Sequence, residues 1–342
     1  MLAILADDLT GALDSAAPFA GRGLHTEVAL SRDSIVGIVE DRPDVLSINL
    51  NTREIGADEA RAATAAVMAL LPIGTQLFKK VDSRLKGNIF AELDAIPFRQ
   101  ALVAPAIPEF ERIVEDGRVT GFGIDTPIVI TNRLGPHAAR AHAPNTRTPA
   151  DMDAVLAAAE SDGTDLLIGA RGLAEALARR MTAGISAQAA TIPPGRITFV
   201  IGSRDPITLK QIDALRGSHS LNYLPAPNGT LGAAPDTGTD LTLVQATPAA
   251  EELDPQLVSE ALADGMNRNF AGYDGTLLLS GGATAEAVLR RLGLSRLRLH
   301  GECLPGLGVA SAQGRCIIAK SGGFGHPDTL KHIADMVLRK AG

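Results

Sequence analysis

Short apolar runs alternate with stretches of helical periodicity along most of the chain. In the first half, strands are expected at Leu2–Ala6, Thr26–Leu30, Val45–Leu50, Gln76–Val81, Ala101–Ala104 and Leu166–Gly169, and helices at Leu9–Gly21, Asp58–Leu71 and Leu173–Met181. In the second half, strands are expected at Ile197–Ile201, Thr242–Val244, Thr276–Leu279 and Cys316–Ala319, and helices at Pro206–Leu215, Pro255–Asn269, Thr284–Leu292 and Pro327–Arg339. This alternation predicts an α/β fold with largely parallel sheets flanked by helices.

The periodic pattern lapses between Thr182 and Arg196, where Ala, Gly, Ser and a Pro-Pro pair predominate. Such punctuation is typical of a linker, and 342 residues suit two domains of roughly 100 to 200 residues each. We therefore expect domains at 1–182 and 197–342, joined by a linker at 183–196. Residues 109–149 are richer in Gly, Pro and turn residues, so a β-ribbon or irregular structure is expected there.

The composition excludes several classes of function. Only 3% of the residues are aromatic, there is no Trp, and 32 Lys and Arg face 39 Asp and Glu, for a net charge of −7. Such a chain lacks the broad basic surface and the stacking platforms that nucleic-acid binding uses. The scarcity of aromatic residues also argues against an aromatic-lined polysaccharide cleft.

The sequence predicts a cytoplasmic protein. Cys303 and Cys316 are the only cysteines, too few for a disulfide framework, which favours a reducing compartment. The first apolar run lacks a preceding basic region and is followed by two Asp residues, so no signal peptide is expected here. The long uncharged stretch at 62–78 is interrupted by Pro72 and Gly74, so no membrane span is expected.

Charged residues follow three predicted strands in the first half. Asp7 and Asp8 follow the first strand, Arg53 the third, and the fourth ends in Lys79, Lys80, Asp82, Ser83 and Arg84. Ligands of parallel sheets bind at the carboxyl ends of strands, and this mixture suits an anionic polyol. Strand alternation makes Lys79 the better inward candidate. The alternative is that Asp7 or Asp8 caps a helix and that the lysines and Arg84 are surface charges.

Glycine-rich loops follow three predicted strands in the second half. They are Gly202-Ser203, Ser280 to Thr284, and Lys320 to Gly325. Backbone N–H groups in such loops and at helix starts favour phosphate, although the glycines could simply permit tight turns. No G-x-x-x-x-G-K-[ST] motif occurs, and near matches to G-x-G-x-x-G at 21–26 and 306–311 lack the last glycine. A P-loop and a Rossmann dehydrogenase are therefore disfavoured.

The motifs together resemble those of the four-carbon acid sugar kinases, in family order and over nearly the whole chain. They are ADDLTGALDSA at 6–16, NTR at 51–53, KKVDSRLKGN at 79–88, APAIP at 104–108, GARGLAEALA at 169–178, GSRDPITLKQI at 202–212, SGGATAEAVLRRLG at 280–293, GECLPGLG at 301–308 and AKSGGFGHPDTL at 319–330. The resemblance implies a sugar-acid-binding domain, a nucleotide-binding domain and an active site in the cleft between them.

The resemblance also implies roles for individual residues. Contacts to an acid such as threonate, erythronate or an oxo-tetronate carry over to Asp7, Asp8, Arg53, Lys79, Asp82 and Ser83. Arg53 and Lys79 would hold the carboxylate, and Asp8 or Asp82 would be the catalytic base. ATP contacts carry over to Ser203, Gly281, Gly282, Thr284, Gly322 and Gly323, and Ala283 is included with them as part of the same nucleotide loop. Mg²⁺ is the expected metal, with no protein ligands assigned to it. A homodimer would be unsurprising for such an enzyme.

The chain departs from the family pattern in two ways. Ala283 stands where the family commonly has Asp or Glu, so a contact to ribose or to a metal-bound water is missing or supplied elsewhere. The chain is also shorter than typical members, mainly around 109–151 and 216–253. Two other hypotheses remain open: a sugar-acid sensor of the same fold without turnover, and a two-domain nicotinamide-dependent hydroxy-acid dehydrogenase.

Overall fold

The computed structural model describes residues 1–233 and 238–338. The chain divides into two compact units, Met1–Gln188 and Ala189–Gly342. This division falls within the stretch 183–196 that the sequence assigns to a linker. Within the described residues, no helix combines the length and the apolar composition needed to cross a bilayer.

The first unit is built on a parallel sheet with the strand order β2-β3-β1-β4-β10-β5-β9. A separate antiparallel ribbon contains β6, β7 and β8. The strands are β1 (Leu2–Ala6), β2 (Thr26–Ala29), β3 (Val45–Asn49), β4 (Gln76–Lys80), β5 (Ala101–Ala104), β6 (Arg112–Glu115), β7 (Arg118–Gly121), β8 (Ile128–Val129), β9 (Ala141–His142) and β10 (Leu166–Gly169). The helices are α1 (Leu9–Ala20), α2 (Ile35–Glu40), α3 (Ala57–Met68), α4 (Ile89–Leu93), α5 (Ile130–Leu134), α6 (Pro149–Ser161) and α7 (Arg171–Met181).

The second unit has the strand order β12-β13-β11-β14-β17-β16-β15. The pairs from β12 to β17 are parallel, whereas β17-β16 and β16-β15 are antiparallel. The strands are β11 (Ile197–Ile201), β12 (Asn222–Pro227), β13 (Leu241–Thr247), β14 (Thr276–Ser280), β15 (Arg296–Leu304), β16 (Leu307–Ala312) and β17 (Arg315–Lys320). The helices are α8 (Pro206–Ser218), α9 (Pro255–Phe270), α10 (Gly282–Arg291) and α11 (Thr329–Leu338).

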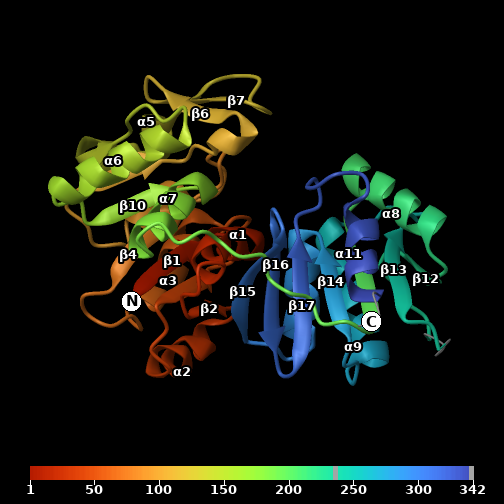
Figure 1. The fold of residues 1–342 in the computed structure, drawn as a ribbon. Helices are drawn as coiled ribbons and strands as arrows, with labels where there is room; N and C mark the ends of the chain where they lie inside the picture. Colours follow the sequence, from red (N-terminus) through yellow and green to blue (C-terminus); the bar gives the residue numbers. More distant parts are fainter. Residues whose placement is uncertain (234–237, 339–342) are drawn as a thin grey trace. The chain divides into compact units, whose positions relative to one another are not determined.

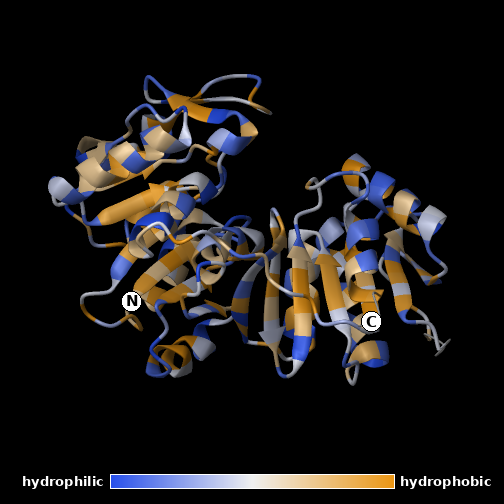
Figure 2. Cartoon of the chain, viewed as in Figure 1, coloured by the Kyte–Doolittle hydropathy of each residue, from blue (hydrophilic) through white to orange (hydrophobic). Residues whose placement is uncertain are grey.

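The α/β fold predicted from the apolar runs is confirmed in both units. The central strands β1, β11 and β14 are buried at every position, and Figure 2 shows apolar residues concentrated along the strands of each unit. Strands covered by helices on both faces read as continuous apolar runs, which is why these strands could be recognised. The expected β-ribbon in 109–149 corresponds to β6–β8 (Figure 1).

Several elements were not foreseen, including α2, α4, α5, α6, β9, β12, β15 and β16. Strand β12 contains Pro225 and Pro227, which are tolerated because β12 is the terminal strand in the order given above and pairs only with β13. The last residue of the helix predicted at 327–339, Arg339, lies outside the described residues.

Candidate functional site

The carboxyl ends of β1, β3 and β4 bring the predicted charged residues of the first unit together. The charged group consists of Asp7, Asp8, Arg53, Lys79, Lys80 and Asp82. β1 pairs in parallel with both neighbours, so that Ala6 lies opposite Asn49 and Lys80. Arg53 Nε and Nη2 donate to the two carboxylate oxygens of Asp7 at 2.9 and 2.8 Å, and Nη1 donates to Asp8 Oδ2 at 2.6 Å. Arg53 therefore bridges the two carboxylates that follow β1.

The backbone fixes this arrangement. The N–H groups of Thr52 and Arg53 donate to the carbonyl of Asp7 at 2.9 and 3.2 Å. Gly87 has a φ of +86°, and a Cβ at this position would lie 2.9 Å from Asp7 Oδ2 and 3.7 Å from Arg53 Cα. A left-handed φ with this close approach favours glycine, so Gly87 lets the loop after β4 close on the Asp7–Arg53 pair.

Asp8 has two structural roles. Its side chain caps α1, with Oδ1 accepting from the Gly11 N–H at 2.8 Å, and Oδ2 accepts from Thr10 Oγ1 at 2.7 Å. The alternative of a helix cap is therefore correct for Asp8, without removing it from the charged group. Asp8 retains 21% of its side-chain exposure, compared with 2% for Asp7, so Asp8 is the carboxylate that a ligand can reach.

Lys79 lies inward, as expected, but its ammonium group is paired with a buried carboxylate. Its side chain is fully buried, with Nζ 3.1 Å from Glu92 Oε2 and donating to the Leu5 carbonyl at 3.2 Å. The reason is that α4 presents Glu92 to that face of β4. Lys80 is the lysine that lies near Asp8: a Cβ on Gly11 would lie 2.6 Å from Asp8 Oδ1 and 3.0 Å from Lys80 Nζ.

The charges of the group stabilise one another. Burial alone would raise the pKa of Asp7, but the hydrogen bond from Arg53 and the charges of Lys79 and Lys80 hold that pKa below its ordinary value. Burial alone would lower the pKa of Arg53, but Asp7 and Asp8 raise it. Asp7 and Arg53 therefore both remain charged at neutral pH.

The loop after β4 places Asp82 and Ser83 at the same edge. Asp82 Oδ2 accepts from the Arg84 N–H at 2.9 Å, and its charge acts on Arg53 as well. Ser83 Oγ accepts from Arg112 Nη1 at 2.5 Å. Arg112 begins β6, and the sequence pattern held no signal that would have singled it out.

The second unit has a cavity of about 410 Å³ at the ends of β11 and β14. These strands pair in parallel, with Ile201 opposite Ser280, so the loops that follow them meet. The cavity contains five of the seven predicted nucleotide residues together with aliphatic neighbours: Ser203, Gly281, Gly282, Ala283, Thr284, Leu253, Pro255 and Val258. Gly322 lies against the same loops, since a Cβ on it would lie 2.3 Å from Ser203 Oγ.

The glycines are required for these loops to pack together. A Cβ on Gly202 would lie 1.8 Å from Thr284 Oγ1, and Gly281 has a φ of +104°. Helix α10 begins at Gly282, and the first N–H groups of a helix have no acceptor within it. A helix N-terminus lined by glycine is suited to phosphate, so the geometry fits the nucleotide expected for this unit.

Hydrogen bonds from Lys320 and from Gln211 on α8 fix the loop after β17. The fully buried Lys320 Nζ donates to the carbonyls of Ser321 and Gly322 at 2.9 and 3.0 Å, and to Thr208 Oγ1 at 3.3 Å. Gln211 Nε2 donates to the carbonyl of Phe324 at 3.0 Å. Burial lowers the pKa of Lys320 to about 8, an effect that Asp205 opposes.

The described residues contain no group of three or more His, Cys, Asp or Glu side chains placed to hold a metal ion. Mg²⁺ commonly binds through one or two carboxylates, waters and substrate phosphates rather than an all-protein cage. The cavity fits that pattern in part, because Glu252 also lines it.

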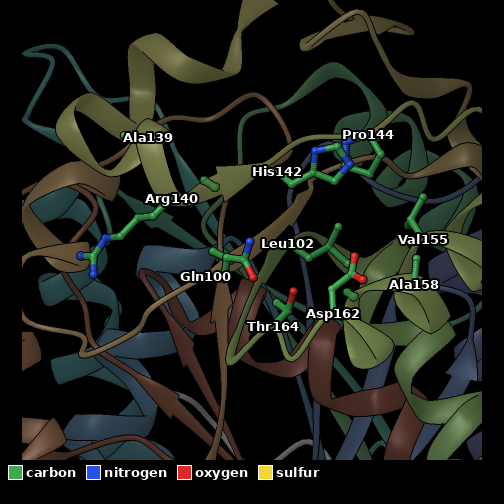
Figure 3. Close-up of a pocket in the computed structure, with 13 residues that line it drawn as sticks. Gln100, Leu102, Ala139, Arg140, His142, Pro144, Val155, Ala158, Asp162 and Thr164 are labelled. Atoms are coloured by element: carbon green, nitrogen blue, oxygen red, sulfur yellow. The ribbon is translucent and has the colours of Figure 1, made fainter.

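A different cavity, of about 370 Å³, lies in the first unit beside Gln100 and Leu102 at the start of β5. Figure 3 shows Gln100, Asp162 and Thr164 around it, with the Arg140 side chain extending away from them. Arg140 instead donates to the Phe98 carbonyl and stacks 3.7 Å above the Phe98 ring centroid. Because this cavity lies at the amino ends of parallel strands, it is separate from the charged group.

Comparisons with known proteins agree with two domains that bind different ligands. A model of the sugar-binding N-terminal domain matches residues 2–167, and a model of the nucleotide-binding C-terminal domain matches residues 230–330. The fold and the two sites thus define a protein that joins a sugar-binding to a nucleotide-binding domain. By this architecture, the chain belongs to the four-carbon acid sugar kinase family.

Individual relatives bear out the family. A D-threonate kinase of Bordetella bronchiseptica is 27% identical, with 99% of this chain and 98% of the relative covered. A D-erythronate kinase of Heliobacterium modesticaldum is 36% identical over 33% of this chain and 28% of its own length. A solved structure from Salmonella typhimurium LT2 has the same fold, with a TM-score of 0.75, 18% identity and coverage of 97% of this chain and 98% of that chain.

Proposed function

We propose that this protein is an ATP-dependent kinase that phosphorylates a hydroxyl group of a four-carbon acid sugar, such as D-threonate or D-erythronate. The observation that carries the proposal is the Asp8 carboxylate, which Arg53 and the start of α1 hold at the carboxyl edge of the sugar-binding unit. A fixed, partly exposed carboxylate beside cations suits a hydroxylated anion. The relatives named as kinases of D-threonate and D-erythronate support the substrate class.

In this proposal, Asp8 accepts the proton of the substrate hydroxyl, and Asp82 is the second candidate base. The hydroxyl oxygen forms a bond to the terminal phosphorus, the bond from that phosphorus to ADP breaks, and the proton passes to the carboxylate. ATP supplies the phosphoryl group, and Mg²⁺ neutralises charge on the phosphates. Arg53 holds both carboxylates after β1 in place, and Lys80 contributes a lysine charge beside Asp8.

The second unit would hold the nucleotide. The phosphates would lie at the N–H groups of Gly282, Ala283 and Thr284. The loops could approach the phosphates closely at four further residues: Ser203, Gly281, Gly322 and Gly323. Leu253, Pro255 and Val258 line the same cavity and offer adenine an aliphatic surface in a chain without Trp.

The test is an ADP-release assay with D-threonate, D-erythronate and oxo-tetronates, with Mg²⁺ present or omitted. We expect Mg²⁺-dependent turnover of at least one acid, and a loss of about 10²- to 10⁴-fold in kcat for Asp8→Asn, as is typical for a general base. Asp58→Asn is the matched control because Asp58 is almost fully exposed and pairs only at the surface with Arg61. Near wild-type turnover in both Asp8→Asn and Asp82→Asn would refute the base assignment.

The second candidate function is a sensor that binds the acid without phosphorylating it, and the absence of a carboxylate at Ala283 is the observation that favours it. Calorimetry separates the two, since a sensor binds the acid but forms no ATP-dependent product.

We also propose a cytoplasmic location, supported by Cys303 and Cys316, which are free thiols. Burial raises the pKa of both thiols, that of Cys303 to about 12, so neither is reactive. The expected homodimer remains a prediction that sedimentation of the purified chain would test.

A further inference from the structure

Two guanidinium groups lie side by side at the edge of the charged group in the first unit. Arg84 follows β4, and Arg112 begins β6 in the ribbon (Figure 1). The point that a Cβ on Gly123 would occupy lies 2.8 Å from Arg84 Nη2 and 3.2 Å from Arg112 Nη2. The ribbon thus carries a second arginine to the loop that holds Asp82 and Ser83.

Among the described residues, neither guanidinium of the pair forms an ion pair with a carboxylate. Arg112 donates to Ser83 Oγ, and its Nε and Nη2 donate to the carbonyl of Phe122 at 3.2 and 2.8 Å. The guanidinium of Arg84 makes no hydrogen bond or ion pair with any of the residues at 1–233 and 238–338. Two like charges held together without a carboxylate between them are unfavourable, and burial together with the charge of Arg84 lowers the pKa of Arg112.

Two other cations of the group are already paired with carboxylates. Arg53 is bound to Asp7 and Asp8, and Lys79 is bound to Glu92. Asp82 acts on both Arg53 and Arg112, which places the arginine pair in the same group as the candidate base. Lys80 is buried and donates to the Val81 carbonyl at 2.9 Å, so the more exposed positive charge that remains for an incoming anion lies at Arg84 and Arg112.

We propose that Arg84 and Arg112 together bind the carboxylate of the acid sugar and so select the acid over the corresponding neutral polyol. A guanidinium offers five N–H donors in a plane that matches a carboxylate, and the neutral contacts of Arg112 leave part of this capacity unused. This inference rests on the proposed function and assigns the acid-recognition site to the β6–β7 ribbon and the β4 loop. It leaves Arg53 with the role of ordering Asp7 and Asp8.

The experiment compares Arg84→Met, Arg112→Met, the double variant and Arg112→Lys with wild type. Arg118→Met is the matched control, because Arg118 is an exposed arginine on the adjacent strand β7. Calorimetry measures the Kd for D-threonate without nucleotide, and ADP release measures KM and kcat for D-threonate and for threitol, its neutral counterpart. Arg84→Met is the informative single variant, because it removes no hydrogen bond or ion pair that the Arg84 guanidinium makes with the described residues.

We expect each Met variant to raise Kd and KM for D-threonate by about tenfold or more, as for loss of a charge-assisted hydrogen bond, with kcat nearly unchanged. Turnover of threitol should not change, so the preference for the acid falls, and Arg112→Lys should give an intermediate effect.

Failure of this inference and failure of the proposed function differ in their results. If the wild type phosphorylates D-threonate and the double variant has the same KM and Kd, the carboxylate site is wrong and the kinase stands. If the wild type binds D-threonate without phosphorylating it and the variants lose binding, the carboxylate site stands and the kinase is wrong.

Discussion

Replacing Lys79 distinguishes a structural ion pair from a substrate contact. Lys79 Nζ and Glu92 Oε2 are 3.1 Å apart and both side chains have no exposure. Thr52 Oγ1 donates to the other oxygen of Glu92. In Lys79→Met, the Glu92 carboxylate would remain buried with Thr52 but without its cation.

Breaking a buried ion pair by removing one partner costs about 3–5 kcal/mol of unfolding free energy, whereas removing both charges is often nearly neutral. We therefore expect Lys79→Met to lose about that amount. The double variant Lys79→Met/Glu92→Gln should recover most of it, because the Gln oxygen can still accept from Thr52. Since a loss of 1 kcal/mol lowers Tm by roughly 2–4 °C for a unit of this size, the single variant should melt roughly 10 °C earlier.

Urea unfolding followed by circular dichroism gives these free energies, and the KM for D-threonate is measured on the same samples. Arg180→Met is the control, because its pair with Glu160 is at the surface of the same unit and should contribute less than about 1 kcal/mol. A Lys79→Met variant that kept wild-type stability but had a much larger KM would refute this reasoning and restore Lys79 as a substrate ligand.

Three further predictions concern the nucleotide unit. Gly202→Ala would place a Cβ 1.8 Å from Thr284 Oγ1 and should weaken ATP binding in calorimetry by about tenfold or more, whereas Gly217→Ala, with open space around it, should bind normally. Because the pKa of Lys320 is about 8, its ammonium loses a proton as pH rises through that value. The KM of the wild type for ATP should therefore rise above pH 8. In Lys320→Met, KM should already be raised at pH 7 and should not change further as the pH increases. Ala283→Asp should lower the Mg²⁺ concentration that gives half-maximal rate. An unchanged Mg²⁺ dependence would show that another group already makes the contact that a carboxylate at position 283 would supply.

The sequence predicted the fold and the meeting of strand ends for the same physical reason. The buried strands are continuous apolar runs, and in parallel strands the residues that follow them must gather at one edge. Asp8 and Arg53 could therefore be placed together although 45 positions separate them.

The orientation of Lys79 and Lys80 could not be predicted in this way. Alternation shows that they lie on opposite faces, but both faces of β4 are covered, and only the position of Glu92 on α4 decides which lysine is paired inside. The position of Arg112 could not be predicted either. The ribbon brings Arg112 to Ser83 across 29 positions, and no hydrophobic pattern in the sequence indicates that contact.

The hydrogen bonds of Asp8 indicate which of its oxygens would take a proton in the proposed reaction. Oδ2 already accepts from Thr10 and Arg53, whereas Oδ1 accepts only from the Gly11 N–H among the described residues. A carboxylate oxygen accepts about two hydrogen bonds, so the remaining capacity lies on Oδ1. A substrate hydroxyl would therefore approach Oδ1, on the side where Lys80 Nζ lies close to Gly11, and Arg53 would act on the reaction only through the opposite oxygen.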